Sequence, residues 1–226
     1  RADVRLAAIF KPHMVLQRDM AVPVWGWAEP GETVTVKAAD QTKTTTTTNG
    51  GTWRVALDPM PAGGPHTLTV SGTTTVTCDD VLIGEDWLCS GQSNMAMAVR
   101  SSNNATEEAA AANYPQIRMA TLPRQTAQTP QEDCKLAGWT VCSPETVPGF
   151  SATAYFFGRH LHKQLNIPVG LINASWGGTC IEAWTPQEAL AAIPSGQELI
   201  AQYKERAAAY DADAAKRKDE ERLEWW

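Results

Sequence analysis

The sequence predicts an α/β protein in which an antiparallel β region precedes a parallel α/β region. Short strand-like stretches separated by turn residues fill residues 1–79. Continuous apolar runs, and a helix followed by a buried strand, fill residues 80–185; helix and strand in alternation form the repeat unit of a parallel sheet. Residues 186–226 are rich in Ala, Glu, Lys and Arg and predict helix. We therefore place boundaries near residues 79 and 185.

The antiparallel region is predicted from its turns and from the residues between them. The stretches 34–36 and 68–70 are rich in valine and threonine, as is typical of strands. The run Thr44 to Thr48 is repetitive, but threonine is β-branched and fits a pleated surface, so we interpret the run as a strand. The turn signals are Glu29-Pro30-Gly31, Asn49-Gly50-Gly51 and Pro61-Ala62-Gly63-Gly64.

The parallel region is predicted from uninterrupted apolar runs. Residues 81–84, 87–89 and 169–174 have the composition of strands buried on both faces. Pro168 separates the last of these runs from a helical segment that begins at Ser151 and ends near Asn166. The apolar or ring-bearing residues at helical spacing are Phe156, Phe157, His160, Leu161 and Leu165.

The final region, residues 186–226, predicts one long helix or a helical hairpin. Ile200, Tyr203, Ala207, Tyr210 and Ala214 are spaced alternately three and four residues apart, as on one face of a helix. The adjacent Trp225 and Trp226 would expose a large apolar area at the end of this sequence. We therefore expect a further segment to cover them.

Composition excludes two classes of partner. The chain has 19 Lys+Arg against 25 Asp+Glu, a formal charge of −6, and no basic stripe to neutralise phosphates, so a nucleic-acid partner is not predicted. It has no run of 18 apolar residues, so no membrane span is predicted. The sequence begins with Arg1 rather than Met, which fits a processed polypeptide and leaves export open.

Five cysteines occur without CxxC or Cys/His zinc spacing, so neither a metal site nor a cofactor is predicted. Cys134 and Cys142 flank a short polar segment; either they close a small loop as a disulfide or both are unpaired thiols. A link between Cys89 and Cys180 is a further alternative.

Ser93 lies in a turn directly after the predicted strand 87–89. A serine at a strand-to-helix turn exposes its hydroxyl above the sheet, while backbone amides at the start of the helix point towards atoms bonded to that oxygen. Such a turn suits a nucleophile, although glycine and serine are also common in ordinary turns. The turn reads Ser90-Gly91-Gln92-Ser93-Asn94-Met95.

A second glycine turn follows the strand 169–174. Gly177 and Gly178 allow the main chain to present an amide to a neighbouring site with no side chain in between. By itself this segment is also compatible with an ordinary turn between strand and helix. Both glycine turns leave buried strands at the carboxyl edge of one predicted sheet, which is where open α/β sheets bind ligands.

Four segments of the sequence carry a family likeness: 14–18, which reads Met-Val-Leu-Gln-Arg, 84–95, 150–159 and 175–184. Together they resemble the sialate O-acetylesterase family of the SGNH-hydrolase superfamily. The likeness covers most of residues 6 to 190 and follows the order of the family. It implies a carbohydrate O-acetylesterase with a flavodoxin-like three-layer α/β/α hydrolase domain, incomplete here, preceded by an antiparallel β-sandwich. It also implies a secreted or periplasmic location, or a lysosome-like compartment in a eukaryote.

The resemblance assigns roles to some residues and leaves other roles vacant. Ser93 matches the nucleophile, and its amide together with that of Gly177 or Gly178 matches the oxyanion hole. The Gln-Gly-Glu motif of the family and its Asp-x-x-His motif, which holds the catalytic Asp and His, are absent from this sequence. We expect an associated segment or chain to supply them. The four histidines, His13, His66, His160 and His162, do not match and are interpreted as structural.

Further residues suit an acetylated carbohydrate substrate, either sialic acid or a plant polysaccharide. Gln92 is a candidate hydrogen-bonding partner, and Trp176 is a candidate stacking surface for a sugar ring. Without a histidine base, a second hypothesis also stands: a non-catalytic carbohydrate-binding or assembly module. Its candidate binding residues are Trp25, Trp27 and Trp53 of the β region.

Overall fold

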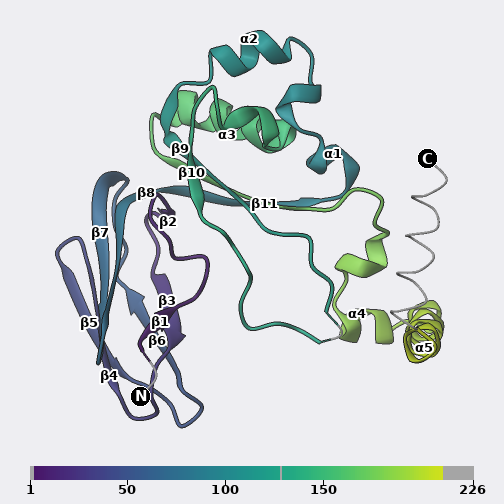
Figure 1. Ribbon diagram of the computed structural model, residues 1–226, viewed down its shortest axis with the longest axis horizontal. Helices are drawn as coiled ribbons and strands as arrows, with labels where there is room; N and C mark the ends of the chain where they lie inside the picture. Colours follow the sequence, from purple (N-terminus) through teal and green to yellow (C-terminus); the bar gives the residue numbers. More distant parts are fainter. Residues whose placement is uncertain (1–2, 128, 211–226) are drawn as a thin grey trace, which may run out of the picture. The chain divides into compact units, whose positions relative to one another are not determined.

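The structure is a computed structural model that describes residues 3–127 and 129–210 (Figure 1). Residues 1–178 form one compact unit and residues 179–226 a second, and each is described by itself. The boundary expected near residue 79 falls inside the first unit, within the 17-residue strand β8 (Thr75–Gly91). The division at this point stays a prediction.

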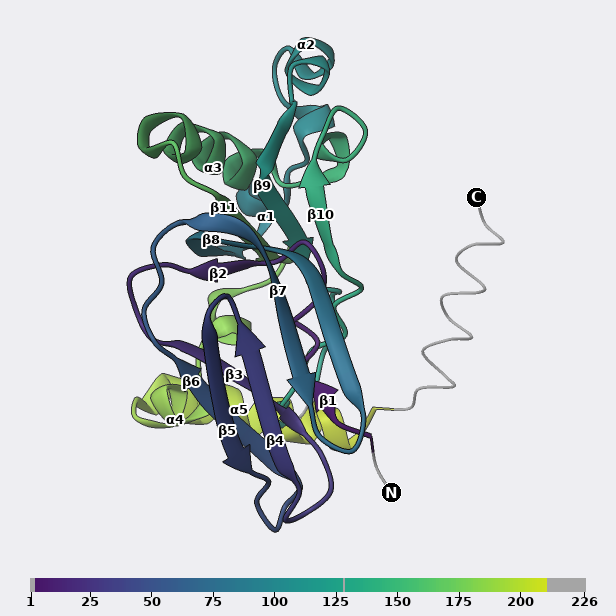
Figure 2. The same ribbon diagram turned by 90° about the vertical axis from the view of Figure 1, so that its left-hand side faces the viewer.

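The strands that precede β8, apart from β2, form two antiparallel arrangements, which Figures 1 and 2 show stacked on one another. One sheet has the order β1-β3-β6, and in the other β5 and β7 flank β4. Strands β3, β4 and β6 bury every second residue, which is the pattern of strands with one face on a core. Their bounds are β1 (Arg5–Leu6), β3 (Val22–Trp27), β4 (Thr33–Ala38), β5 (Gln41–Thr46), β6 (Thr52–Leu57) and β7 (Gly63–Ser71).

The predicted strands of this region are confirmed. The stretches 34–36 and 68–70 lie in β4 and β7, and the threonine run lies in β5 as far as Thr46. Strand β5 pairs with β4 at the edge of its sheet, and its residues alternate between half-buried and exposed. Threonine suits that position because its β-branched side chain favours extended backbone and its hydroxyl tolerates water.

Strand β8 connects the antiparallel part to a parallel sheet. Residues 75–83 pair with β7, residues 82–84 with β2 (Val15–Gln17), and residues 85–91 with β11 (Val169–Ser175). Asp80 interrupts the extended backbone with a φ of 55°. Its carboxylate accepts two hydrogen bonds, at 2.7 and 3.1 Å, from the guanidinium of Arg118, which is 5% exposed. This contact holds the pKa of Asp80 below its ordinary value.

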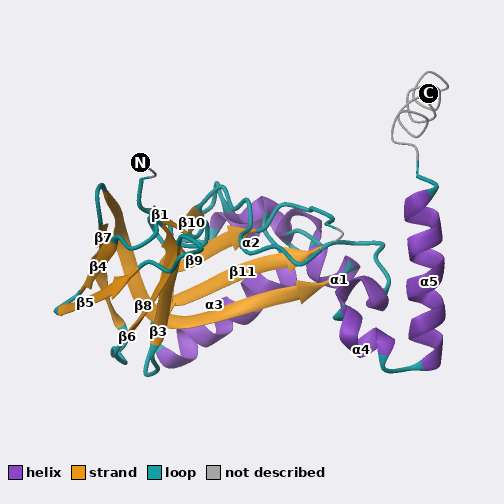
Figure 3. Cartoon of the chain, turned by 90° about the horizontal axis from the view of Figure 1, so that it is seen from below, coloured by secondary structure: helices purple, strands orange, loops and turns teal. Residues whose placement is uncertain are grey.

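The predicted parallel sheet is confirmed. Strand β11 lies between β8 and β9 (Tyr114–Thr121) and runs parallel to both, while β10 (Trp139–Cys142) adds an antiparallel edge. Helices α1 (Ser93–Ala96), α2 (Ala105–Ala110) and α3 (Ala152–Leu165) lie on one side of these strands (Figures 1 and 3). Two short 3-10 helices, η1 (Val99–Ser101) and η2 (Val147–Gly149), lie in the connections.

The predicted helix at residues 151–166 forms as α3, but its buried face differs from the apolar spacing. Ser151 caps the amino end and Asn166 ends the helix in a left-handed conformation. Phe157 and Leu165 are exposed, whereas small residues and Tyr155 face the sheet. A Cβ on Gly158 would lie 2.6 Å from Leu171 Cδ1, so the helix lies close on β11 because this position has no side chain.

The expectation that strand 87–89 is buried on both faces is wrong for the described part of the chain. Leu88 is 66% exposed and Trp87 42% exposed. Trp87 contacts Phe157 of α3 edge to face, with ring centroids 5.0 Å apart. Leu88 alternates to the opposite face, and residues 85–91 pair with β11 alone among the described strands.

One hydrophobic core runs from the antiparallel strands to the back of the parallel sheet. Val24, Val36 and Leu57 from the antiparallel strands share this core with Ala120 of β9 and Trp139 of β10. The indole N–H of Trp139 donates to the Ile9 carbonyl at 2.9 Å, which ties the two parts together across 130 residues. This shared core accounts for the single compact unit 1–178.

The second unit is helical where it is described. It contains η3 (Ile181–Trp184), α4 (Gln187–Ala191) and α5 (Pro194–Ala208), consistent with the hairpin alternative rather than one uninterrupted helix. The two α-helices meet closely, since a Cβ on Gly196 would lie 2.0 Å from the Leu190 carbonyl oxygen. Ala214, Trp225 and Trp226 lie outside the described residues. None of the described helices has the length and apolar character needed to cross a membrane.

Candidate active site

The Ser93 turn begins where β8 ends. Gly91 has a φ of 144°, a conformation that side-chain-bearing residues rarely adopt, and it redirects the chain from the strand into α1. Ser93 is the first residue of α1 and is exposed. The sequence therefore places the Ser93 hydroxyl above the carboxyl end of a sheet strand, as predicted from the turn.

Gln92 holds both polar groups of Ser93. Its side-chain oxygen Oε1 accepts a hydrogen bond from the Ser93 backbone amide at 3.0 Å and another from Ser93 Oγ at 2.8 Å. The amide that the family resemblance assigns to the oxyanion hole is thus occupied by a neighbouring acceptor. Sequence reasoning named Gln92 only as a candidate substrate contact, because spacing alone does not show which way a side chain turns.

Helix α1 is attached to the start of α3. Thr153 Oγ1 donates to the Asn94 carbonyl at 2.9 Å, and the Ala152 amide donates to the Met97 carbonyl at 2.8 Å. The segment after α1 also forms an isolated β-bridge between Ala98 and Ser151. These bonds fix the serine turn to a 14-residue helix that packs on the same sheet.

The second glycine turn lies beside the first. Strands β8 and β11 are parallel with Gly91 opposite Ser175, so both chains leave the sheet at the same edge. The amide of Trp176 donates to the Gly91 carbonyl at 3.0 Å. A Cβ on Gly177 would lie 3.4 Å from Ser93 Oγ, which places the Gly177 backbone directly against the candidate nucleophile.

Gly178 takes a different position from Gly177. Its φ of 80° is left-handed, and no heavy atom lies within 4 Å of a Cβ placed on it. The structure therefore brings Ser93, Gln92 and Gly177 together, and Trp176 joins them through its backbone. The left-handed conformation of Gly178 then directs the chain away from Ser93.

None of the four histidines, all of which lie in the described residues, hydrogen-bonds to Ser93. His13 Nδ1 contacts Asp80 Oδ2 at 2.7 Å, and His162 Nδ1 contacts the Ile167 carbonyl at 2.7 Å. His160 is exposed on α3, and His66 lies in β7. The structure thus gives Ser93 no base from the described residues.

Asp86 is a perturbed carboxyl group that the sequence analysis did not single out. It interrupts the apolar run before Ser93 and lies over Gly170, where an added Cβ would meet Asp86 Oδ1 at 2.6 Å. Among the described residues, Oδ1 has no hydrogen-bond partner. Burial raises the pKa of Asp86 to about 7. The available signal was the acidic pair Glu85-Asp86 between the apolar runs 81–84 and 87–89.

The five cysteines lie at separate positions among the described residues. All five cysteines are free thiols, so neither the Cys134–Cys142 nor the Cys89–Cys180 disulfide is present. Cys142 is buried in the core beneath α3, whereas Cys134 packs against the other core cluster, which separates the first pair. No group of three His, Cys, Asp or Glu residues in the described ranges is arranged to hold a metal ion.

Comparison with known proteins gives consistent matches. The family profile described as carbohydrate esterase, sialic acid-specific acetylesterase, matches residues 84–214. Sialate O-acetylesterases of Pongo abelii and Homo sapiens are each 38% identical to this chain over 208 residues. Each alignment covers 83% of this chain and 40% of the relative, so the chain spans about two fifths of the length of these proteins.

A solved structure agrees with the sequence matches. A carbohydrate acetylesterase from Xanthomonas citri superposes with a TM-score of 0.81 at 32% identity, covering 86% of this chain and 45% of that one. The profile match includes both glycine turns and more than half of the chain. The chain therefore belongs to the carbohydrate esterase family of sialic acid-specific acetylesterases.

Proposed function

We propose that this chain supplies the nucleophile and part of the oxyanion hole of a serine esterase that removes O-acetyl groups from carbohydrates. The observation that carries the proposal is the contact between the two glycine turns. Ser93 is exposed at the end of β8, and the Gly177 backbone lies against its hydroxyl. Family membership supplies the chemistry of the substrate, an acetyl ester on a sugar such as sialic acid or a plant polysaccharide.

The reaction follows the two steps of acyl transfer. Ser93 Oγ attacks the acetyl carbonyl carbon while a base accepts the hydroxyl proton, and the carbonyl oxygen becomes an oxyanion. The base returns the proton to the sugar oxygen as the C–O bond to the sugar breaks, leaving acetyl-Ser93. Water, deprotonated by the same base, then attacks the acyl-enzyme and releases acetate and free Ser93.

Backbone amides stabilise the oxyanion in this scheme. The donors are the amide of Ser93 and that of Gly177 or Gly178, and the loss of one such donor typically costs about 3 kcal/mol of transition-state stabilisation. Gln92 Oε1 now accepts from the Ser93 amide. We propose that the acetyl oxygen displaces it on binding, while Gln92 and the indole of Trp176 contact the sugar.

The base and its carboxylate partner are proposed to come from a segment outside this sequence that carries Asp-x-x-His. Two features of the described residues support this. The histidines make their contacts elsewhere, and residues 85–91 of β8 have β11 on one edge and no described strand on the other. A further strand and covering helix there would bury Leu88 and complete the three-layer α/β/α arrangement. The β-sandwich assignment of residues 1–79 and a secreted, periplasmic or lysosome-like location belong to the same proposal.

Acetate release tests the function. A protein that contains this sequence together with the Asp-x-x-His segment is given O-acetylated sialoglycan and acetylated xylan in parallel, with Ser93→Ala as the matched control. We expect release from at least one substrate and a loss of several powers of ten in the variant. Equal release by wild type and Ser93→Ala would overturn the assignment of the nucleophile.

A further inference from the structure

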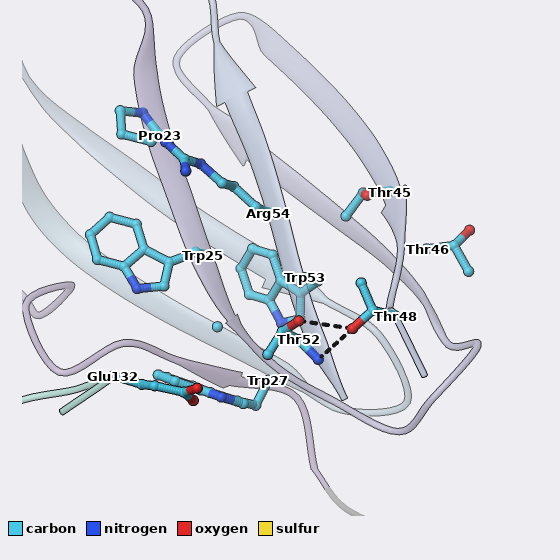
Figure 4. A pocket seen from close by; sticks show the side chains of 11 residues that line it. Pro23, Trp25, Trp27, Thr45, Thr46, Thr48, Thr52, Trp53, Arg54 and Glu132 are labelled. Atoms are coloured by element: carbon cyan, nitrogen blue, oxygen red, sulfur yellow. Dashed lines mark hydrogen bonds between the residues drawn. The ribbon is translucent and has the colours of Figure 1, made fainter. Parts of the chain in front are cut away.

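A pocket of about 610 Å³ lies on the antiparallel part of the first unit, and Ser93 is not among its lining residues (Figure 4). Its wall is formed by the outer face of β3 and β6, the edge of β5, and Glu132 from the connection between β9 and β10. The pocket is lined by all three tryptophans of the non-catalytic hypothesis. Its lining also includes polar residues that the sequence did not associate with these tryptophans. The polar lining residues are Thr45, Thr46, Thr48, Thr52, Arg54 and Glu132.

The alternation of β3 directs two of the indoles to this face. Val22, Val24 and Gly26 are buried, so Pro23, Trp25 and Trp27 lie on the opposite face of the strand. Residues two apart on a strand are about 6.5 Å apart, so the two rings are neighbours along the pocket wall. Figure 4 shows Trp25 face-on and Trp27 edge-on, so the two rings form differently oriented surfaces.

Contacts outside the pocket hold these two rings in place. Phe10 contacts Trp25 edge to face, with ring centroids 4.8 Å apart. The guanidinium of Arg5 lies 3.9 Å from the centroid of the Trp27 ring and also bonds to Asp133 at 2.8 Å. Rings fixed in this way lose little conformational freedom when a ligand binds, which favours affinity.

Trp53 closes the pocket on its core side, because it pairs with Gly26 on the buried face of β6 and belongs to the hydrophobic core. Its side chain is 3% exposed and lies between Trp25 and the threonines in Figure 4. Among the described residues, its Nε1 has no hydrogen-bond acceptor. Alternation along β6 places this indole on the face opposite Thr52 and Arg54, so the surface open to a ligand is that of Trp25, Trp27 and the polar lining residues.

The polar lining residues suit hydroxyl groups. Arg54 lies opposite Trp25 in the strand pairing and donates only, whereas Glu132 accepts only. Thr48 and Thr52, joined by a 2.8 Å hydrogen bond between their hydroxyls, can do both. One positive and one negative side chain leave the lining without net charge, which favours a neutral ligand rich in hydroxyls over an anion.

We propose that this pocket binds a neutral oligosaccharide of pyranose rings. The C–H faces of the sugars stack on Trp25 and Trp27, and the sugar hydroxyls bond to Arg54, Glu132 and the threonines. The pocket thereby adds a glycan-binding site to a chain of a carbohydrate esterase family. This binding goes beyond the proposed esterase function, because it requires neither Ser93 nor an acetyl group.

Calorimetric titration of the 226-residue chain tests the proposal, with tryptophan fluorescence as a second readout. The probes are xylohexaose, cellohexaose and sialyllactose, none of which carries an acetyl ester. We expect at least one neutral hexasaccharide to bind with a change in fluorescence, and sialyllactose to bind more weakly. Because these probes are not substrates, the result is independent of whether the esterase proposal holds.

Three variants identify the binding surface. Trp27→Ala is expected to raise the Kd about tenfold or more, which corresponds to about 1.4 kcal/mol. Arg54→Ala removes an exposed strand residue without disturbing the core and is expected to raise the Kd several-fold. Met20→Ala changes an apolar residue that is 55% exposed and lies outside the lining, so it should leave the Kd unchanged.

The outcomes that overturn the proposal are specific. Absence of binding by all three oligosaccharides to the wild type would contradict the pocket as a glycan site, whatever the esterase assay gives. Preferential binding of sialyllactose would contradict a neutral ligand. Unchanged Kd values in both Trp27→Ala and Arg54→Ala would place binding elsewhere. If Trp27→Ala lowers the Tm, its Kd no longer reports on the pocket alone. The Kd of the exposed Arg54→Ala variant then decides whether the ligand binds in this pocket.

Discussion

Gln92 Oε1 accepts hydrogen bonds from both the amide and the hydroxyl of Ser93, at 3.0 and 2.8 Å. The acceptor therefore lies where the oxyanion of an attacked ester would bind its donor. In the proposed esterase, a bound acetyl group must replace this oxygen before the Ser93 amide can stabilise a transition state. Gln92 is thus a cap on the turn and, in the proposed esterase, a competitor of the substrate.

Gln92 can be tested with a matched pair of substitutions in the protein that includes the Asp-x-x-His segment. Gln92→Glu keeps an acceptor for the Ser93 amide but adds a negative charge beside the developing oxyanion, so kcat is expected to fall at least about 100-fold. Gln92→Ala removes the competitor and the cap together. We expect it to lower the free energy of unfolding by about 1 kcal/mol and to keep kcat within about tenfold of wild type. Equal kcat values for the two variants would contradict the placement of Gln92 beside the oxyanion.

Gly177 and Gly178 are predicted to fail in different ways when replaced. Gly177→Ala fits the backbone but places a methyl group 3.4 Å from Ser93 Oγ, so activity should fall while the Tm stays near wild type. Gly178→Ala has space around it but must adopt a φ of 80°, which costs about 1 kcal/mol or more. Acetate release and thermal unfolding of both variants separate the two effects. A Gly177→Ala variant with full activity would show that the second turn does not lie beside the ester that Ser93 attacks.

Asp86 is predicted to make stability depend on pH. Its pKa of about 7 in the folded chain lies above the value of about 3.9 in an unfolded chain. The folded state therefore binds the proton more tightly, and this group lowers stability as the pH rises from about 4 to about 7. Asp86→Asn is expected to raise the Tm relative to wild type at about pH 8 and to have little effect at about pH 4.

Thermal unfolding of both proteins at the two pH values checks this. Glu85→Gln is the control, because Glu85 pairs with Arg18 at 2.8 Å and the same substitution should lower rather than raise the Tm at about pH 8. A Tm difference between Asp86→Asn and wild type that does not change with pH would contradict the perturbed carboxyl.

The parts of the fold that sequence predicted are those with a local signal. The strand predicted over Thr44 to Thr48, which ends at Thr46, follows from side-chain type. The extent of α3 follows from helical spacing, and the placement of β8 and β11 in one parallel sheet follows from continuous apolar runs. The buried face of α3 has no such local signal, because Gly158 faces Leu171 for its lack of a side chain, a fit that hydropathy does not reveal.

The candidate site also has features that the sequence predicts and features that it does not. Ser93 and Gly177 were found because each turn ends an apolar strand, and the parallel register then brings them together. The direction of the Gln92 side chain depends on its rotamer, which the sequence does not specify. The grouping of Arg54 and Glu132 with the tryptophans depends on contacts between residues distant in sequence. No periodicity in the sequence encodes these contacts.

Leu88 provides a test of the proposed additional segment. In the 226-residue chain this side chain is 66% exposed, so Leu88→Ser should change the free energy of unfolding by less than about 0.5 kcal/mol. We use the term longer protein for one that also contains the proposed Asp-x-x-His segment. There, a strand and helix that cover Leu88 would make Leu88→Ser lower the free energy of unfolding by about 2 kcal/mol or more. Leu171→Ala, at a fully buried position, should destabilise both proteins and serves as the control. Similar small effects of Leu88→Ser in both proteins would show that the segment does not pack on β8.

The most direct test of the proposed esterase is to trap the acyl-enzyme. The longer protein is mixed with an acetyl ester, quenched in acid within the first turnover, and mapped by peptide mass spectrometry. The account predicts one acetyl group on Ser93, absent from Ser93→Ala, together with acetate release that the variant loses. An acetyl group on another residue, or undiminished acetate release by Ser93→Ala, would contradict the assignment of Ser93 as the nucleophile.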